Sequence, residues 1–221
     1  MPDKKSLVES LLEAPHSDDA HTILDVLADE LDSIKDPKIA SFVKSLLLKA
    51  DAFWIAPSSF DHSNHPPDEW GLGGLVLHTK RVVRVALMLS NAFECSIQEL
   101  DILTAAALLH DVTKAVMKTG SDDILHDTMH PYTVDAFVEH CKIEDETAAN
   151  SIKPNAFEID DESAAMILRL IHCSHGFWSP IPETIPISHL ERTLHMADLV
   201  ATHIHILADG FEVDEEKWKT K

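Results

Sequence analysis

The chain has 221 residues, of which 45% are hydrophobic and 6% aromatic, and this composition is typical of a globular domain with a substantial core. Its charge is strongly acidic, with 38 Asp and Glu against 18 Lys and Arg and a formal net charge of −20. Such a field disfavours binding to long nucleic acids and to anionic membranes. We therefore expect neither partner, and homo-oligomerisation is left open.

The three cysteines, Cys95, Cys141 and Cys173, form no C-x-x-C pair, and reduced thiols are the simplest interpretation of an odd number. The N-terminal segment carries charges throughout and lacks the apolar core of a signal peptide. No apolar run approaches the roughly 20 residues needed to span a bilayer. These features predict a cytoplasmic protein.

Helical periodicity runs along almost the whole chain. Asp36 followed by Pro37 is typical of a helix start, because aspartate caps the first turn and proline fits into it. Because alternating strands and hairpin turns are not evident, the predicted fold class is all-α. Further helices are expected over residues 73–91, 97–111, 131–142, 144–151, 161–175 and 188–208.

Two irregular stretches rich in proline, glycine and aromatic residues interrupt the helices, at 56–74 and 176–188. His78 follows the first and His175 precedes the second, so these loops are either walls of a pocket or ordinary connectors. The predicted organisation is an N-terminal helical extension over 1–50 that packs on the core, a main domain over 51–210 and a polar tail over 211–221.

A charged pair ends the apolar run AAALLHDVTK, which covers residues 105–114. His110 and Asp111 stand side by side at its end, and Lys114 follows. A carboxylate at the C-terminus of a helix is disfavoured by the helix dipole unless a cation compensates its charge. Helix capping alone does not explain the neighbouring histidine, whereas a metal ion would use both side chains.

Other histidines and aspartates lie in comparable places. His78 is near the start of an apolar helix, and His130 precedes a proline suited to a first helical turn. His172 and His175 are three residues apart on one helix face, and Asp198 has apolar neighbours. Each is weak evidence alone, but imidazoles with carboxylates suit one or two divalent ions such as Mn, Fe, Co, Ni or Zn.

The order of these residues resembles the H…HD…H…H…D pattern of the HD-domain superfamily of metal-dependent phosphohydrolases. The resemblance covers about residues 53–208 and implies an all-α HD-domain helical bundle with an N-terminal helical extension. Five blocks, FWIAPSS, GGLVLHT, ALLHDVTK, CSHGFWSP and LHMADLVA, are most similar to the HD domain of bacterial HD-type 3'-5' exoribonucleases. Two positions depart from the pattern: Thr113 replaces a glycine, and Ser174 replaces the first of two adjacent histidines found in many dinuclear members.

The resemblance also implies a ligand set. His78, His110, Asp111 and Asp198 are expected to bind a first metal. A second, weaker metal is expected at His130 and His175, with Asp111 as a bridge. Catalytic roles are expected for Asp111 and for two cations that could bind phosphate, Lys114 and Arg81. The alternatives are a solvated lysine for Lys114 and a surface salt bridge for Arg81.

The implied activity is hydrolysis of a phosphomonoester or phosphodiester, in a nucleotide or short oligonucleotide, by a metal-activated hydroxide. A metal makes this possible because it lowers the pKa of bound water to about 7. Two alternatives stay open: an HD-type diiron oxygenase acting on a small polar substrate, and a non-catalytic metal-stabilised nucleotide-binding regulatory module. The roles of the remaining histidines are also open, namely those of His62, His65, His172 and His195.

Overall fold

A computed structural model describes residues 23–61, 64–117, 124–126, 129–148, 157–176, 179 and 181–203. Residues 1–22 of the predicted extension, His62 and the tail over 211–221 lie outside the described residues. In chain order the elements are η1 (Asp25–Leu27), α3 (Ala28–Ser33), α4 (Pro37–Leu48), α5 (Asp51–Ile55), η2 (Pro67–Glu69), α6 (Gly74–Ser90), α7 (Ile97–Leu109), β1 (Ala115–Met117), β2 (Ile124–His126), α8 (His130–Ala148), α9 (Asp161–His172), η4 (Pro182–Thr184) and α10 (His189–His203), where η denotes a 3₁₀ helix.

The all-α prediction is confirmed, with two local differences. Residues 131–148, predicted as parts of two helices at 131–142 and 144–151, form the single helix α8, because no proline or glycine interrupts the chain between them; residues 149–151 lie outside the described residues. A short antiparallel ribbon of β1 and β2 was not predicted, and its three residue pairs are too few to produce a visible alternation.

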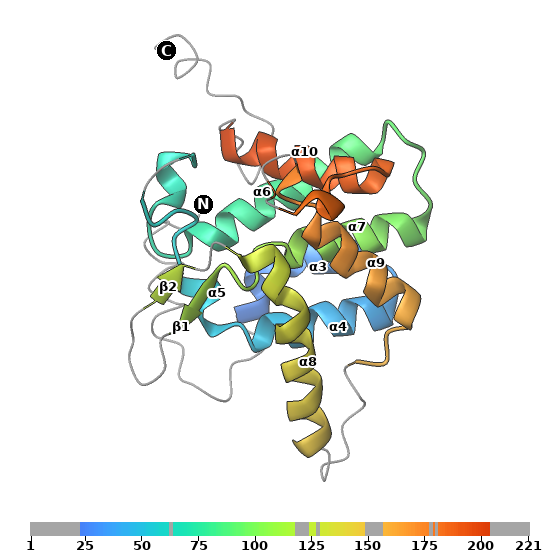
Figure 1. Ribbon diagram of the computed structural model, residues 1–221, viewed down its shortest axis with the longest axis horizontal. Helices are drawn as coiled ribbons and strands as arrows, with labels where there is room; N and C mark the ends of the chain where they lie inside the picture. Colours follow the sequence, from blue (N-terminus) through green and yellow to red (C-terminus); the bar gives the residue numbers. More distant parts are fainter. Residues whose placement is uncertain are drawn as a thin grey trace.

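Helix α7 is the centre of the bundle. It packs against α6 on one side and against α9 and α4 on others, while α10 lies along α6 (Figure 1). Every residue of α7 from Asp101 to Leu109 is buried, as expected for a helix that is apolar around its whole circumference. The C-terminal end of α7 therefore lies in the middle of the molecule, and the pair His110 and Asp111 follows it there.

Several helices begin at the capping residues that their sequences indicate. The Asp36 carboxylate accepts hydrogen bonds from the amides of Lys38 and Ile39, so the predicted start of α4 is confirmed. Ser96 and Glu99 form a reciprocal capping box at the start of α7. These caps satisfy amides that have no partner within the helix and thereby set where each helix enters the bundle.

The described part of the N-terminal segment shares the core of the main domain. Side chains of α4 such as Phe42 and Leu46 are fully buried and belong to the same apolar cluster as α7. Asp101 of α7 accepts hydrogen bonds at 2.8 Å from the amides of Lys35 and Asp36, which join α3 to α4. The domain boundaries at residues 50 and 210 stay a prediction.

Across the described residues, every helix is too short or too polar to serve as a membrane span. No disulfide joins any two of the three cysteines.

Asp101→Ala should lower the free energy of unfolding by about 3 kcal/mol, because it leaves two backbone amides without their charged acceptor. Urea denaturation followed by circular dichroism would measure this change. The control is Asp32→Ala, which removes an exposed aspartate from α3. It should change the free energy of unfolding by less than about 0.5 kcal/mol. Equal effects of the two substitutions would contradict an anchoring role for Asp101.

Candidate metal centre

Six side chains predicted as metal ligands converge in one place, although they come from five different parts of the chain. Helix α6 contributes one, the turn after α7 two, the start of α8 one, the turn after α9 one and α10 one. These residues are, in that order, His78, His110 and Asp111, His130, His175 and Asp198.

The first group surrounds one oxygen of Asp198. Nε2 of His78 lies 3.1 Å and Nε2 of His110 lies 3.9 Å from Oδ1 of Asp198. One ligand atom from each of these three residues falls within 4.8 Å of the other two, a spacing that could hold a metal ion. Oδ2 of Asp111 borders the group, at 3.5 Å from Nε2 of His110 and 3.8 Å from Nε2 of His78.

The second group of side chains lies on the other side of the Asp111 carboxylate. Oδ1 of Asp111 is 2.7 Å from Nε2 of His130, and the ring of His175 meets that of His130 edge-on at a centroid distance of 4.8 Å. The two oxygens of Asp111 thus face two different sets of histidines.

His110 provides a direct test of whether these residues fit a metal. Its Nδ1 lies 2.8 Å from the Ala107 carbonyl oxygen, which can only accept, so Nδ1 carries the proton. Burial lowers the pKa of His110, which keeps the ring neutral and leaves a lone pair on Nε2. Nε2 is buried and has no hydrogen-bond partner among the described residues. A buried imidazole lone pair without a proton donor is suited to a divalent cation.

Lys114 supplies positive charge to the same carboxylate. Its Nζ lies 2.8 Å from Oδ2 of Asp111, and the lysine is buried rather than solvated. Burial raises the pKa of Asp111, but Lys114 and the neighbouring histidines outweigh burial and hold that pKa well below its usual range. The carboxylate is therefore ionised, and Lys114 compensates its charge at the C-terminal end of α7.

Arg81 is held in a buried group of ion pairs beside His78. Its guanidinium pairs with both oxygens of Asp68, at 3.1 and 2.7 Å, and also donates to Glu69. The side chain is only 1% exposed, so its ion pairs are buried rather than at the surface, and a contact with phosphate stays a prediction. The spacing put Arg81 correctly on the helix face of His78, but the carboxylates come from a loop whose path the sequence does not reveal.

Of two further histidines, His195 supports a turn of the site and His172 does not. Nδ1 of His195 lies 2.8 Å from the carbonyl oxygen of Ser174 and so holds the turn that carries His175. Gly176 in that turn has a φ of +55°, and a Cβ atom there would lie 2.2 Å from Cε1 of His195. His172 instead faces α8, where its Nε2 lies 3.1 Å from the Asp135 carboxylate.

Thr113, which stands where the HD-domain pattern has a glycine, has a structural role. Its hydroxyl donates to the carbonyl oxygen of His130 at 2.8 Å, and the hydroxyl of Thr133 donates to that of Thr113 at 3.1 Å. The threonine therefore ties the turn that carries Asp111 to the first residue of α8.

Glu69 was not singled out from the sequence, yet it is fully buried beside His78. In the sequence it is one of 38 acidic residues and shares no helix face with a predicted ligand. Only the fold of the loop over residues 56–73 brings it to the centre.

An open cleft of about 360 Å³ adjoins the centre. His175, His195 and Asp198 line it, together with Asn64 and Thr202. No described residue that lines it is a lysine or arginine. The volume suits a small molecule, and the lining offers imidazole and carboxylate groups rather than a row of cations.

The HD domain family model matches residues 75–203, which is more than half of the chain and includes all six converging residues. The chain therefore belongs to the HD-domain family, whose members bind divalent metals and are in general metal-dependent hydrolases. Comparison with curated proteins gave no match, and neither did comparison with solved structures.

Metal affinity should increase with pH. Burial lowers the pKa of His78, but the carboxylates of Glu69 and Asp198 outweigh burial and raise it to about 9. A proton must therefore leave His78 before its Nε2 can bind a metal at neutral pH. Between pH 6 and pH 8 the affinity for Mn²⁺ should rise by roughly tenfold per pH unit. Calorimetry in buffers of different ionisation enthalpy would count the protons released, and release of none would contradict this expectation.

Proposed function

We propose that this protein is a metal-dependent phosphohydrolase that acts on a small phosphomonoester or phosphodiester, such as a nucleotide or short oligonucleotide. The main support is the convergence of four histidines and two aspartates beside an open cleft, with a buried lone pair on Nε2 of His110. Membership of the HD-domain family supports the same reaction class.

His78, His110 and Asp198, with Asp111, would hold a first divalent ion. His130 and His175 would hold a second, with Asp111 between the two. Burial, followed by the nearby His130, lowers the pKa of His175 to about 4, so its ring is neutral and able to bind a metal at pH 7. When bound, a divalent metal supplies Lewis acidity, which favours ionisation of a coordinated water and offsets charge on phosphate.

Lys114 is proposed to contact a phosphate oxygen of the substrate. Its ammonium already lies at the centre, 2.8 Å from Asp111, and its buried side chain is held close to the reacting region. As a point charge with three donors it can follow a phosphate oxygen without a fixed orientation.

A small substrate is favoured by both volume and charge. The cleft of about 360 Å³ lies at the lower end of the range typical of small-molecule sites. A net charge of −20 opposes approach of a long polyanion, whereas one or two phosphates can be balanced locally by metal and Lys114. Cleavage of a terminal phosphodiester, which the similarity to HD-type exoribonucleases suggests, is one reaction within this class.

Metal analysis of the purified protein, combined with a panel of phosphomonoester and phosphodiester substrates, tests the proposal. We expect bound Mn, Fe, Co, Ni or Zn and release of phosphate or of a nucleotide. Oxygen uptake with a small polar substrate would favour the diiron oxygenase instead. Nucleotide binding without turnover would favour the regulatory module.

Asp111→Ala should remove metal and activity together, because it deletes the carboxylate shared by both groups. The expected loss in kcat/KM is at least about 100-fold. Asp101→Ala is a matched control, since it removes a buried aspartate from the opposite end of the same helix. Full metal occupancy in Asp111→Ala would contradict the assignment.

Lys114→Met should separate substrate binding from metal binding. A hydrogen bond to a charged group contributes about 1.5–3 kcal/mol, so kcat/KM should fall by roughly 10- to 100-fold. Metal affinity should hold or increase, because the substitution removes a cation that competes for Asp111. Lys80→Met, on α6 and paired with Glu30, is the control. Parallel loss of metal and activity in Lys114→Met would contradict a role in substrate binding.

A further inference from the structure

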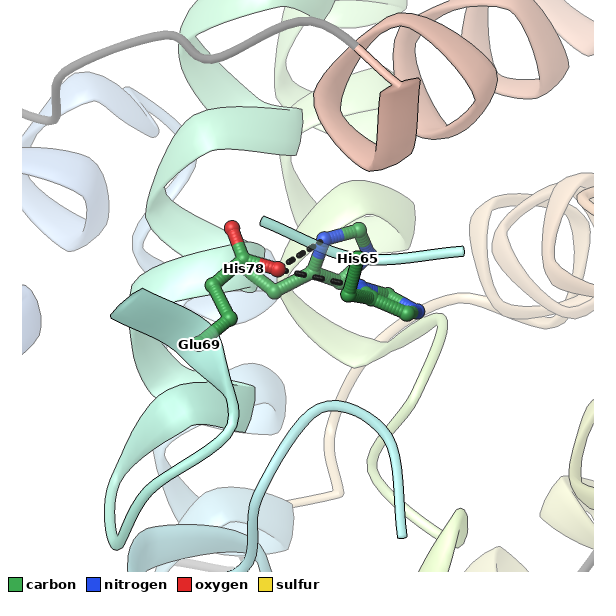
Figure 2. A group of neighbouring side chains, drawn as sticks. All are labelled: His65, Glu69 and His78. Carbon is green, nitrogen blue, oxygen red and sulfur yellow. Dashed lines mark hydrogen bonds and ion pairs between the residues drawn. The ribbon is translucent and has the colours of Figure 1, made fainter. Parts of the chain in front are cut away.

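A second group of titratable side chains lies against His78, on the opposite side of its ring from Asp198. Nδ1 of His78 is 3.4 Å and Nδ1 of His65 is 2.9 Å from the same oxygen of Glu69, Oε2 (Figure 2). The rings of the two histidines meet edge-on at a centroid distance of 4.7 Å. One fully buried carboxylate thus serves both imidazoles, while Nε2 of His78 faces the metal centre.

The backbone of Glu69 is fixed from two directions. Its carbonyl oxygen accepts hydrogen bonds at 3.0 Å from both the amide and the hydroxyl of Ser58. Behind it, the start of α6 comes so close that a Cβ atom on Gly74 would lie 1.8 Å from this carbonyl oxygen. Because residue 74 is a glycine, the loop can pass close to the start of α6 and place Glu69 beside His78.

The side chain of Glu69 is fixed by charge. Its second oxygen accepts from Arg81, whose guanidinium is itself held by Asp68. Burial raises the pKa of Glu69, but His78, His65 and Arg81 outweigh burial and hold the pKa well below its usual range. The carboxylate is ionised and can only accept. Nδ1 of His65 lies within hydrogen-bond distance of it, whereas Nδ1 of His78, at 3.4 Å, makes an ion-pair contact that is longer than a hydrogen bond.

His65, Glu69 and His78 have a spacing that could itself hold a metal, but their surroundings do not suit one. The Arg81 guanidinium already neutralises this carboxylate and would repel a divalent ion. The 2.9 Å separation of His65 and Glu69 is that of a hydrogen bond. These contacts favour a group that orients His78 over a further ion site.

We propose that Glu69 is the positioning residue for His78: its carboxylate, 3.4 Å from Nδ1, accepts a hydrogen bond from Nδ1–H when a metal binds and so directs Nε2 toward Asp198 and His110. Metal-binding histidines commonly donate their second ring nitrogen to a carboxylate, which fixes both tautomer and ring orientation. Without that acceptor the ring can adopt the other tautomer or turn over, and the fraction ready to bind metal falls. This inference rests on the metal centre of the proposed function.

Glu69→Gln should weaken binding of Zn²⁺, measured by calorimetry at fixed pH, by roughly 10- to 100-fold. Glu30→Gln is the matched control, because it also neutralises an acid paired with a cation of α6, Lys80, but lies outside the group of contacts around Glu69. It should change the affinity less than about twofold. Equal affinities for Glu69→Gln and the unsubstituted protein, or equal losses in the two variants, would overturn the proposal.

A second measurement needs no variant. Long-range proton–nitrogen correlation spectra of the ¹⁵N-labelled, Zn²⁺-loaded protein should show His78 protonated at Nδ1 and coordinated through Nε2. Coordination through Nδ1 would overturn the proposal even if Glu69→Gln did not fold. In Glu30→Gln the Nδ1 proton should persist, whereas in folded Glu69→Gln it should exchange more rapidly with water.

The test of the role of Glu69 and the test of the phosphohydrolase proposal can fail independently. If the protein binds Zn²⁺ through Nε2 of His78 but hydrolyses no substrate of the panel, the phosphohydrolase proposal fails and the role of Glu69 stands. If the protein binds no metal, the proposed function fails, and the spectrum of the metal-free protein decides whether Glu69 holds the Nδ1 proton of His78. Absence of that proton would overturn the inference.

Discussion

The Asp111 carboxylate is buried at the C-terminal end of α7, where the helix dipole adds to its negative charge. An isolated charge in that place would be strongly destabilising, so the surrounding fold must supply positive or proton-donating groups. Lys114 does so from the next turn, and His130 does so from the start of α8. The convergence of helix ends on one carboxylate follows from this requirement, and the same requirement makes the place suitable for a divalent cation.

Buried hydrogen bonds and ion pairs support the centre from several elements of the described chain. Thr113 ties the turn of Asp111 to α8, and His195 holds the turn that carries His175. Glu69 adds a third support, beneath His78, and is itself held by Arg81. Precise placement of ligands depends on such neighbours, because a side chain that can rotate freely binds a metal only in a fraction of its conformations. Most of these supports are buried hydrogen bonds, which connect the stability of the fold to the geometry of the site.

The proposed preference for a small phosphorylated substrate is consistent with the distribution of charge in the molecule. The overall charge of −20 repels polyanions at a distance, whereas the centre collects lysine, imidazole and, in the proposed function, metal within a few ångströms. Screening in salt leaves the short-range attraction largely intact, since it acts in a buried place. A cleft whose described lining carries histidines and an aspartate rather than arginines is consistent with a ligand whose phosphate is bound chiefly at the centre itself.

The sequence by itself determined the helical class and the start of α4 at Asp36, because periodicity and capping are local signals. The set of residues expected at the centre came from the resemblance of their order to the HD-domain pattern, since each residue alone carries little information. Only the tertiary structure decided which side chains Arg81 and Glu69 contact. Arg81 shares the helix of His78, which suggested a phosphate contact, but its partners Asp68 and Glu69 reach it from a loop with a separate path. Ion pairs depend on distances between segments that local propensity does not encode. The β1–β2 ribbon escaped prediction for a related reason, since three paired residues are stabilised by the fold around them and not by their own pattern.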